Sequence, residues 1–187
     1  MTLKYWQVLT LAGSLRAASM NRAMLDMAAA CAPPGLHLES FDGLGDLPLF
    51  NPDLEANEPA AVARLREAIA AADAVLIASP EYAHGVSSVM KNALDWMVAH
   101  GVFVDKPVLL WNASPRASIA LAALRETLSV MTADLVEGAE LCLLIQSKDG
   151  QPPSNPDPAA MRRALDTLQQ GLQRRQHSRL AGLVSAE

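Results

Sequence analysis

Short apolar runs alternate with longer stretches of helical periodicity along most of the chain. The apolar runs predict strands over residues 5–12, 36–41, 74–78, 108–112 and 140–146, and the pattern leaves open whether the last strand starts a few residues earlier. Apolar positions three and four residues apart predict helices over residues 20–32, 59–72, 86–100 and 117–131, and from Pro158 onward. This alternation predicts a parallel sheet with helices on both faces. A ligand crevice is expected at the carboxyl ends of the strands, at the topological switch point.

Local signals refine this picture. Ser19 is suited to be the N-cap of the first helix, and Gly101 is suited to end the third. Residues 42–58 form a long connection rich in Asp, Pro, Asn and Gly, and such connections are usually functional or mobile. We expect a single domain over residues 1–176, followed by a loose tail over residues 177–187.

Composition and charge exclude several classes of function. The chain has 187 residues, 51% of them hydrophobic, which is enough to bury a full core. The net charge is −5 with Lys and Arg scattered along the chain, which disfavours a nucleic-acid partner. No apolar stretch approaches the ~20 residues that cross a membrane, and the start of the chain leads into a strand rather than a signal peptide. A cytoplasmic protein with no membrane partner is therefore expected.

The cysteines and histidines show no chemical pattern. Cys31 and Cys142 form no Cys-x-x-Cys motif, and we expect both to be ordinary buried thiols, a redox role being the lesser possibility. The histidines are isolated and lack metal-ligand spacing, so no metal site is expected; they are His37, His84, His100 and His177.

The most informative segment is the turn Gly13–Asn21, which follows the first strand. It offers a glycine, two hydroxyls, an arginine and an amide just before a helix N-terminus, where backbone N–H groups and the helix dipole favour an anion. It is neither a Walker loop nor a Gly-x-Gly-x-x-Gly fingerprint. A well-capped turn would explain Gly13 and Ser19, but it leaves Arg16 unexplained, and a guanidinium is suited to bidentate phosphate contacts.

A second loop, Ser79–Ser88, follows the third strand. Pro80 restricts the exit from the strand, Gly85 permits a sharp turn or close approach to a flat ligand, and Tyr82 offers a ring for stacking. A hydrophilic loop with one aromatic residue is the alternative interpretation, and His84 alone is more typical of a surface residue than of an acid or base.

Together these motifs resemble the NADPH-dependent FMN reductase family. The matching segments are Gly-Ser-Leu-Arg-x-x-Ser-x-Asn after the first strand, Pro-Glu-Tyr followed by Lys-Asn-Ala-Leu-Asp-Trp, and Leu-Pro-Leu-Phe-Asn-Pro-Asp at residues 47–53. The resemblance implies a flavodoxin-like three-layer sandwich whose five-stranded parallel sheet has the order 2-1-3-4-5. It extends from the first strand to at least the fourth helix and includes quinone, chromate and azo-dye reductases.

The resemblance also implies roles for individual residues. Ser14, Arg16, Ser19 and Asn21 would hold the FMN phosphate, whereas Pro80, Glu81, Tyr82 and Gly85 would line the flavin ring and ribityl chain, with Ser114 as a further cofactor ligand. Family-typical residues that are less clearly ligands are Lys91, Asn92, Asp95 and Trp96, and Trp96 is a candidate interface residue because the third helix often packs on a partner subunit.

The chain departs from the family pattern in two loops. Many relatives have Asn at the position of Ala83 and Pro-Gly at Ser87-Ser88. The loop after the fourth strand, usually rich in glycine, contains none over residues 112–118, and Pro115 removes a backbone donor. Arg116 in this loop either contacts a phosphate or an anionic substrate or faces solvent, and the sequence leaves both open.

The resulting hypothesis is an FMN-dependent oxidoreductase. NADPH or NADH would reduce the flavin, and a small acceptor such as a quinone, or free flavin, would then take its place. No side chain is required as an acid or base, so no catalytic residue is predicted. One alternative is a flavin-binding electron carrier or sensor without significant NAD(P)H turnover, and another is a site that binds a different phosphorylated ligand. A homodimer or homotetramer is expected from the resemblance.

Overall fold

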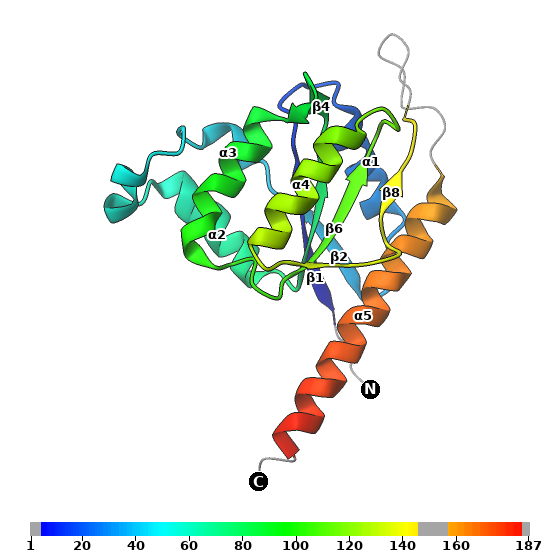
Figure 1. Cartoon of the computed structure of the whole chain (residues 1–187). Coiled ribbons are helices and arrows are strands. Elements are labelled where there is room, and N and C mark those ends of the chain that lie inside the picture. Colours follow the sequence, from blue (N-terminus) through cyan, green and yellow to red (C-terminus); the bar gives the residue numbers. More distant parts are fainter. Residues whose placement is uncertain (1–4, 146–156, 185–187) are drawn as a thin grey trace.

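The computed structural model describes residues 5–145 and 157–184, and it has a mostly parallel sheet between two layers of helices (Figure 1). The strands follow the order β2-β1-β3-β6-β7, and β8 also pairs with β6. The predicted flavodoxin-like fold is thereby confirmed. The strands of this sheet are β1 (Trp6–Ala12), β2 (Leu36–Ser40), β3 (Ala74–Ala78), β6 (Pro107–Asn112), β7 (Asp134–Leu135) and β8 (Leu141–Cys142).

The helices divide between the two faces of the sheet (Figure 1). One face packs against α1 (Met20–Ala30) and α5 (Pro158–Val184), and the other packs against α2 (Ala60–Ala71), α3 (Ser88–Met97) and α4 (Ser118–Val130). Short 3-10 helices occupy the connections: η1 (Gly43–Asp46), η2 (Pro52–Asn57) and η3 (Val98–His100). Because both faces are covered, every residue of the central strand β3 is buried, as its continuous apolar sequence predicts.

The fifth predicted strand is split in two. β7 pairs with Pro107 and Val108 at the start of β6, whereas β8 pairs with Trp111 and Asn112 at its end. Gly138, with φ +73°, lies between the two pieces, and the Trp111 indole N–H donates to the Ala139 carbonyl at 2.8 Å. The chain therefore leaves the sheet briefly and returns to it beside the same neighbour.

A small antiparallel hairpin replaces the expected start of the third helix. β4 (Glu81–Tyr82) pairs with β5 (Gly85–Val86), and α3 begins only at Ser88. The Ser87 hydroxyl accepts from the Met90 N–H at 3.3 Å and so caps the helix there. Val86 accordingly belongs to the hairpin rather than to the helix.

The last helix is longer than predicted. It begins at Pro158 as expected but continues to Val184, so most of the segment expected to be a loose tail is helical; residues 185–187 lie outside the described residues. In Figure 1 the end of α5 extends away from the sheet. No helix in the described part of the chain is long and apolar enough to span a membrane.

The prediction that both cysteines are buried was wrong. Cys31 is half-buried and Cys142 is exposed at the edge of the sheet. Partial desolvation raises the pKa of each thiol above its ordinary value, which keeps both protonated and poorly nucleophilic.

Candidate functional site

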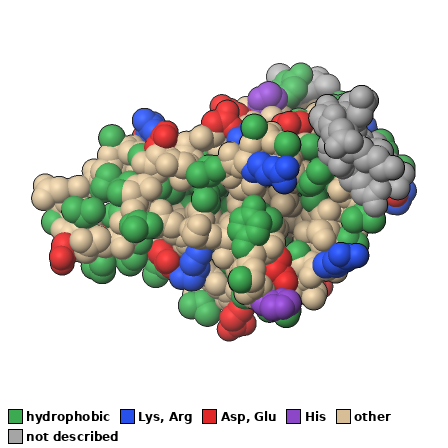
Figure 2. All heavy atoms as spheres, turned by 90° about the horizontal axis from the view of Figure 1, so that it is seen from above, with side chains coloured by type: hydrophobic (Ala, Val, Ile, Leu, Met, Phe, Trp, Pro, Cys, Tyr) green, Lys and Arg blue, Asp and Glu red, His purple; other side chains and the backbone are tan. Residues whose placement is uncertain are grey.

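Three loops at the carboxyl ends of β1, β3 and β6 enclose a pocket of about 380 Å³. Figure 2 views this end of the molecule from above and shows separate basic and acidic side chains among apolar and uncharged surface. Eight of the predicted cofactor ligands line this pocket: Ser14, Arg16, Ser19, Asn21, Pro80, Glu81, Tyr82 and Ser114. Gly85 lies in β5 and is not among the residues that line it.

The polar end of the pocket lies at the N-terminus of α1. The Ser19 hydroxyl accepts from the Arg22 N–H at 3.2 Å, which confirms Ser19 as the N-cap. The Ser14 hydroxyl accepts from the Arg16 N–H at 3.4 Å and fixes the turn before the helix. The Arg16 side chain is exposed and lines the pocket. Hydroxyls, a guanidinium and a helix N-terminus together make an environment suited to a phosphate.

Asn21 joins two of the three loops. Its side-chain oxygen accepts from the Ala113 N–H at 3.2 Å, and the residue is only 6% exposed. The amide oxygen therefore serves the protein, although the residue also lines the pocket. The sequence indicated a phosphate ligand here, but it gave no sign that Asn21 also positions the loop after β6.

The other end of the pocket is more apolar. It is lined by Tyr82 from the hairpin, by Ala117 at the start of α4, and by Leu144 and Ile145 after β8. Tyr82 is 57% exposed, so its ring is available for stacking. Leu144 and Ile145 were not assigned to the site from the sequence; they follow β8, which pairs with the end of β6 beside the pocket.

Glu81 ties the hairpin to α4. One carboxylate oxygen accepts from the Ala120 N–H at 2.9 Å, and the other lies 3.0 Å from Nδ1 of His84. The α4 N-cap, Ala117, provides no side-chain cap, so Glu81 supplies one from a distant part of the chain. The Ala120 N–H first, and then His84, hold the pKa of Glu81 below its ordinary value.

The bond between the Glu81 carboxylate and the Ala120 N–H is expected to be lost at low pH. Because the folded-state pKa of Glu81 is lowered, its contribution is complete above the ordinary value near 4.5 and disappears as the pH falls through the folded-state pKa. Glu81→Gln should therefore destabilise the protein near neutral pH, and its deficit should stay constant from about pH 7 to pH 4.5 and shrink as the pH falls further toward about 3. Denaturant unfolding of both proteins across this range measures the difference. Glu126→Gln, at an exposed site further along α4, is the matched control and should show no such trend.

The hairpin turn is strained. Ala83 and His84 have φ values of +48° and +59°, a left-handed conformation that favours Gly or Asn. The sequence placed the permissive residue at Gly85, but the positive φ values fall one and two residues earlier. Gly85 instead takes part in the β4–β5 pairing, where an added Cβ would lie 3.5 Å from the Tyr82 carbonyl oxygen.

Ala83→Asn should stabilise the protein by about 0.5–1 kcal/mol, because asparagine adopts the left-handed region at lower cost than alanine. Ala83→Val should have the opposite effect, because a β-branched side chain is least tolerated there. Thermal or denaturant unfolding of both variants measures the change. Equal stability of the two variants would contradict the strain at this turn.

The family-typical residues of α3 have structural roles. The Asn92 amide accepts from the Phe50 N–H at 2.8 Å and donates to the Pro48 carbonyl at 3.0 Å, and Lys91 pairs with Asp95. The Trp96 indole N–H donates to the same Pro48 carbonyl at 2.8 Å. Trp96 is 1% exposed and its ring meets Phe50 edge-on, so the prediction that it lies at a subunit interface was wrong. Through these bonds, α3 holds residues 47–50 against the rest of the domain.

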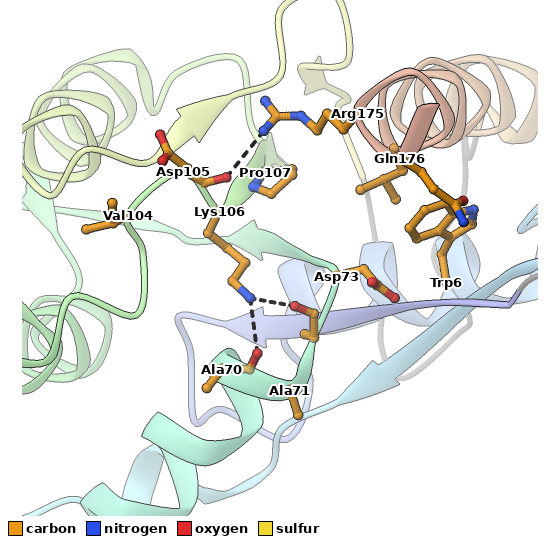
Figure 3. A pocket seen from close by; sticks show the side chains of 12 residues that line it. Trp6, Ala70, Ala71, Asp73, Val104, Asp105, Lys106, Pro107, Arg175 and Gln176 are labelled. Carbon is orange, nitrogen blue, oxygen red and sulfur yellow. Dashed lines mark hydrogen bonds between the residues drawn. The ribbon is translucent and has the colours of Figure 1, made fainter. Parts of the chain in front are cut away.

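A second cavity, of about 400 Å³, lies at the opposite end of the sheet, beside the start of β6 and α5 (Figure 3). Its cationic groups are already engaged within the protein. The Lys106 ammonium donates to the carbonyls of Ala72 and Ala70, and Arg175 pairs with Asp134 and donates to the Asp105 carbonyl. These contacts close the end of α2 and fix α5, so this cavity has a structural explanation.

The chemistry of the first pocket fits FMN. Arg16 and the N-terminus of α1 match the phosphate, and the exposed Tyr82 ring with Leu144 and Ile145 matches a flat apolar ring. Within residues 5–145 and 157–184, no His, Cys, Asp and Glu side chains cluster so as to hold a metal ion.

Comparisons with known proteins agree with this geometry. The model of the NADPH-dependent FMN reductase family matches residues 6–146. An NAD(P)H-dependent FMN reductase of Pseudomonas aeruginosa is 43% identical over 111 residues, which are 58% of this chain and 60% of that one. A quinone reductase of Escherichia coli is 37% identical over 112 residues, with the same coverage of 58% and 60%. The chain thus matches about three fifths of the length of these curated relatives.

Solved structures share the fold over most of the chain. FerB, a flavoenzyme NAD(P)H:(acceptor) oxidoreductase from Paracoccus denitrificans, is 28% identical, with a TM-score of 0.69 and coverage of 90% of this chain and 91% of that one. RosB, solved with a bound riboflavin 5′-phosphate derivative, superposes with a TM-score of 0.72 at 15% identity, covering 97% of this chain and 86% of that one, which is a likeness of fold alone. The resemblance seen in the sequence is confirmed: the chain belongs to the NADPH-dependent FMN reductase family.

Proposed function

We propose that the protein is an FMN-dependent NAD(P)H oxidoreductase that passes electrons to a quinone-like or other small acceptor, or to free flavin. Bound FMN would supply the redox chemistry, accepting a hydride from the nicotinamide and delivering electrons to the acceptor. The curated relatives named as FMN and quinone reductases support this assignment.

The observation that carries the proposal is the polarity of the pocket. Ser14, Arg16, Ser19 and Asn21 gather at the N-terminus of α1, whereas Tyr82, Leu144 and Ile145 line the other end. We assign the first group to the phosphate. Pro80, Glu81, Tyr82 and Ser114 are assigned to the ring and the ribityl chain, with Gly85 contributing through the hairpin backbone alone.

These residues bind and orient the cofactor, and the exposed mouth of the pocket gives access to the second substrate. The described part of the chain offers no separate nucleotide-binding domain, so donor and acceptor would use the same flavin face in turn. Ping-pong kinetics are the expected result. No side chain is proposed as an acid or base.

The test is an anaerobic visible spectrum of protein that has been mixed with FMN and freed of excess. Retained flavin that bleaches with NADPH or NADH and regains its colour with a quinone supports the proposal. Protein that retains no flavin overturns it. Retained flavin that neither nicotinamide reduces favours an electron carrier or sensor, an alternative motivated by the glycine-free loop at residues 112–118.

A homodimer or homotetramer and a cytoplasmic location remain proposals. Exposed apolar side chains around the pocket, at Leu15, Tyr82, Ile119 and Leu144, are consistent with a subunit contact. Light scattering that gives the mass of one chain would overturn the oligomer.

A further inference from the structure

Two turns of the same design lie at the ends of β1 and β6. Their sequences are Gly-Ser-Leu-Arg-Ala at residues 13–17 and Ala-Ser-Pro-Arg-Ala at residues 113–117, and a helix follows each. In each turn the arginine N–H donates to the hydroxyl of the serine two residues earlier, at 3.4 Å for Arg16 and 3.3 Å for Arg116. The pocket therefore carries an arginine at equivalent points of two of its loops.

Both arginine side chains are exposed, and within the described residues neither Arg16 nor Arg116 forms an ion pair or a side-chain hydrogen bond. Many arginines elsewhere are paired, including Arg22 with Asp42, Arg66 with Glu58, Arg125 with Glu140 and Arg175 with Asp134. The pocket thus has two cationic groups that no side chain of the described residues neutralises.

A phosphate at the first turn already has Arg16 as its cationic partner. Arg16 lies with Ser19 and Asn21 at the N-terminus of α1, the polar end of the pocket. β1 and β6 are separated by β3, so the two turns start about 10 Å apart. A phosphate held at the first turn leaves Arg116 beside whatever occupies the other end.

The other end is the one suited to a ring. Arg116 precedes Ala117, which lines the pocket with Tyr82 and Leu144. The bond from the Ala120 N–H to Glu81 fixes the Tyr82 hairpin against the helix that follows Arg116. The Glu81 carboxylate also lies at this end, but its oxygens are bonded to Ala120 and His84, and it forms no ion pair with Arg116 within the described residues.

We propose that Arg116 is the electrostatic partner of the flavin ring and stabilises reduced FMN over oxidised FMN; this rests on the proposed function. A hydride brings two electrons and one proton to FMN and leaves the donor as NAD(P)⁺, so the ring gains one negative charge. A fixed positive charge near the ring favours the charged form and so raises the reduction potential. In this chain the side chain of Arg116 would supply what a glycine-rich loop provides through backbone donors.

The test measures the affinities of oxidised and reduced FMN for Arg116→Gln. We expect reduced FMN to bind about tenfold more weakly while oxidised FMN is little affected. For a two-electron couple, a tenfold change in this ratio lowers the midpoint potential of bound FMN by about 30 mV, which can be read against a reference dye. Arg116→Lys should restore part of the shift.

Arg163→Gln is the matched control, because Arg163 is an exposed arginine on α5 away from the pocket, and it should leave the ratio unchanged. The proposal is overturned if Arg116→Gln keeps the wild-type ratio, or if it weakens both forms of FMN equally. Misfolding is not expected, because the bond to Ser114 uses the backbone of residue 116 and survives the substitution. If the unmodified protein fails to bind FMN, the proposed function fails instead.

Discussion

Replacing Arg16 with alanine should weaken FMN binding about 10- to 100-fold. Arg16 lies at the polar end of the pocket and forms no ion pair with any of the residues that the structure describes. A charge-assisted contact to a phosphate contributes about 1.5–3 kcal/mol. Its exposure puts the expected loss nearer the lower limit and makes it depend on salt. Titration by flavin fluorescence, at low and high ionic strength, measures the change.

Riboflavin provides the control for this prediction. It lacks the phosphate, so Arg16→Ala should leave riboflavin affinity unchanged, and the FMN preference over riboflavin should fall by the same factor as FMN affinity. Unchanged FMN affinity would refute the phosphate role of Arg16. An equal loss for riboflavin would show instead that the substitution deforms the pocket.

Replacing Gly13 with alanine should destabilise the fold by about 1–3 kcal/mol and weaken FMN binding with it. A Cβ built on Gly13 would lie 2.4 Å from the Ser79 hydroxyl oxygen and 2.8 Å from its Cβ. Ser79 is almost fully buried and its hydroxyl lies 3.3 Å from that of Ser87, the cap of α3. The clash therefore displaces the loops after both β1 and β3, and denaturant unfolding measures its cost.

A double variant separates this clash from other effects. In the Gly13→Ala background, Ser79→Gly removes both side-chain atoms in closest contact. The double variant should therefore lose less stability than the two single variants lose in sum. Additive losses would show that the contact between residues 13 and 79 is not the cause.

The sequence predicted the part of the fold that depends on local periodicity. β3 occupies the predicted residues 74–78, and α1 starts where Ser19 caps it. The fifth strand was predicted as continuous because its apolar run gives no sign that Gly138 and the Trp111 indole draw the chain away from the sheet. Helix α5 was ended too early because the last residues of a domain are commonly poorly ordered, whereas here the helix continues to Val184.

For the site, the sequence predicted which residues gather at the strand ends but not the long-range contacts that they make. Residues next to strand ends were found because a parallel sheet brings those ends together, which is why Ser14, Pro80 and Ser114 share one pocket. Roles that depend on long-range side-chain contacts were not predictable. Glu81 reaches a helix 39 residues away, and Trp96 bonds a carbonyl 48 residues away.

The bond between Glu81 and Ala120 also links pocket occupancy to the local unfolding of α4. The first turn of that helix is held by the hairpin that faces the ligand, so a ligand that immobilises the hairpin also suppresses fraying of the helix. By thermodynamic reciprocity, the fluctuations that open the helix end must lower the affinity of the pocket by the same factor. Slowed amide exchange at Ala120 would then report binding from a residue outside the pocket lining.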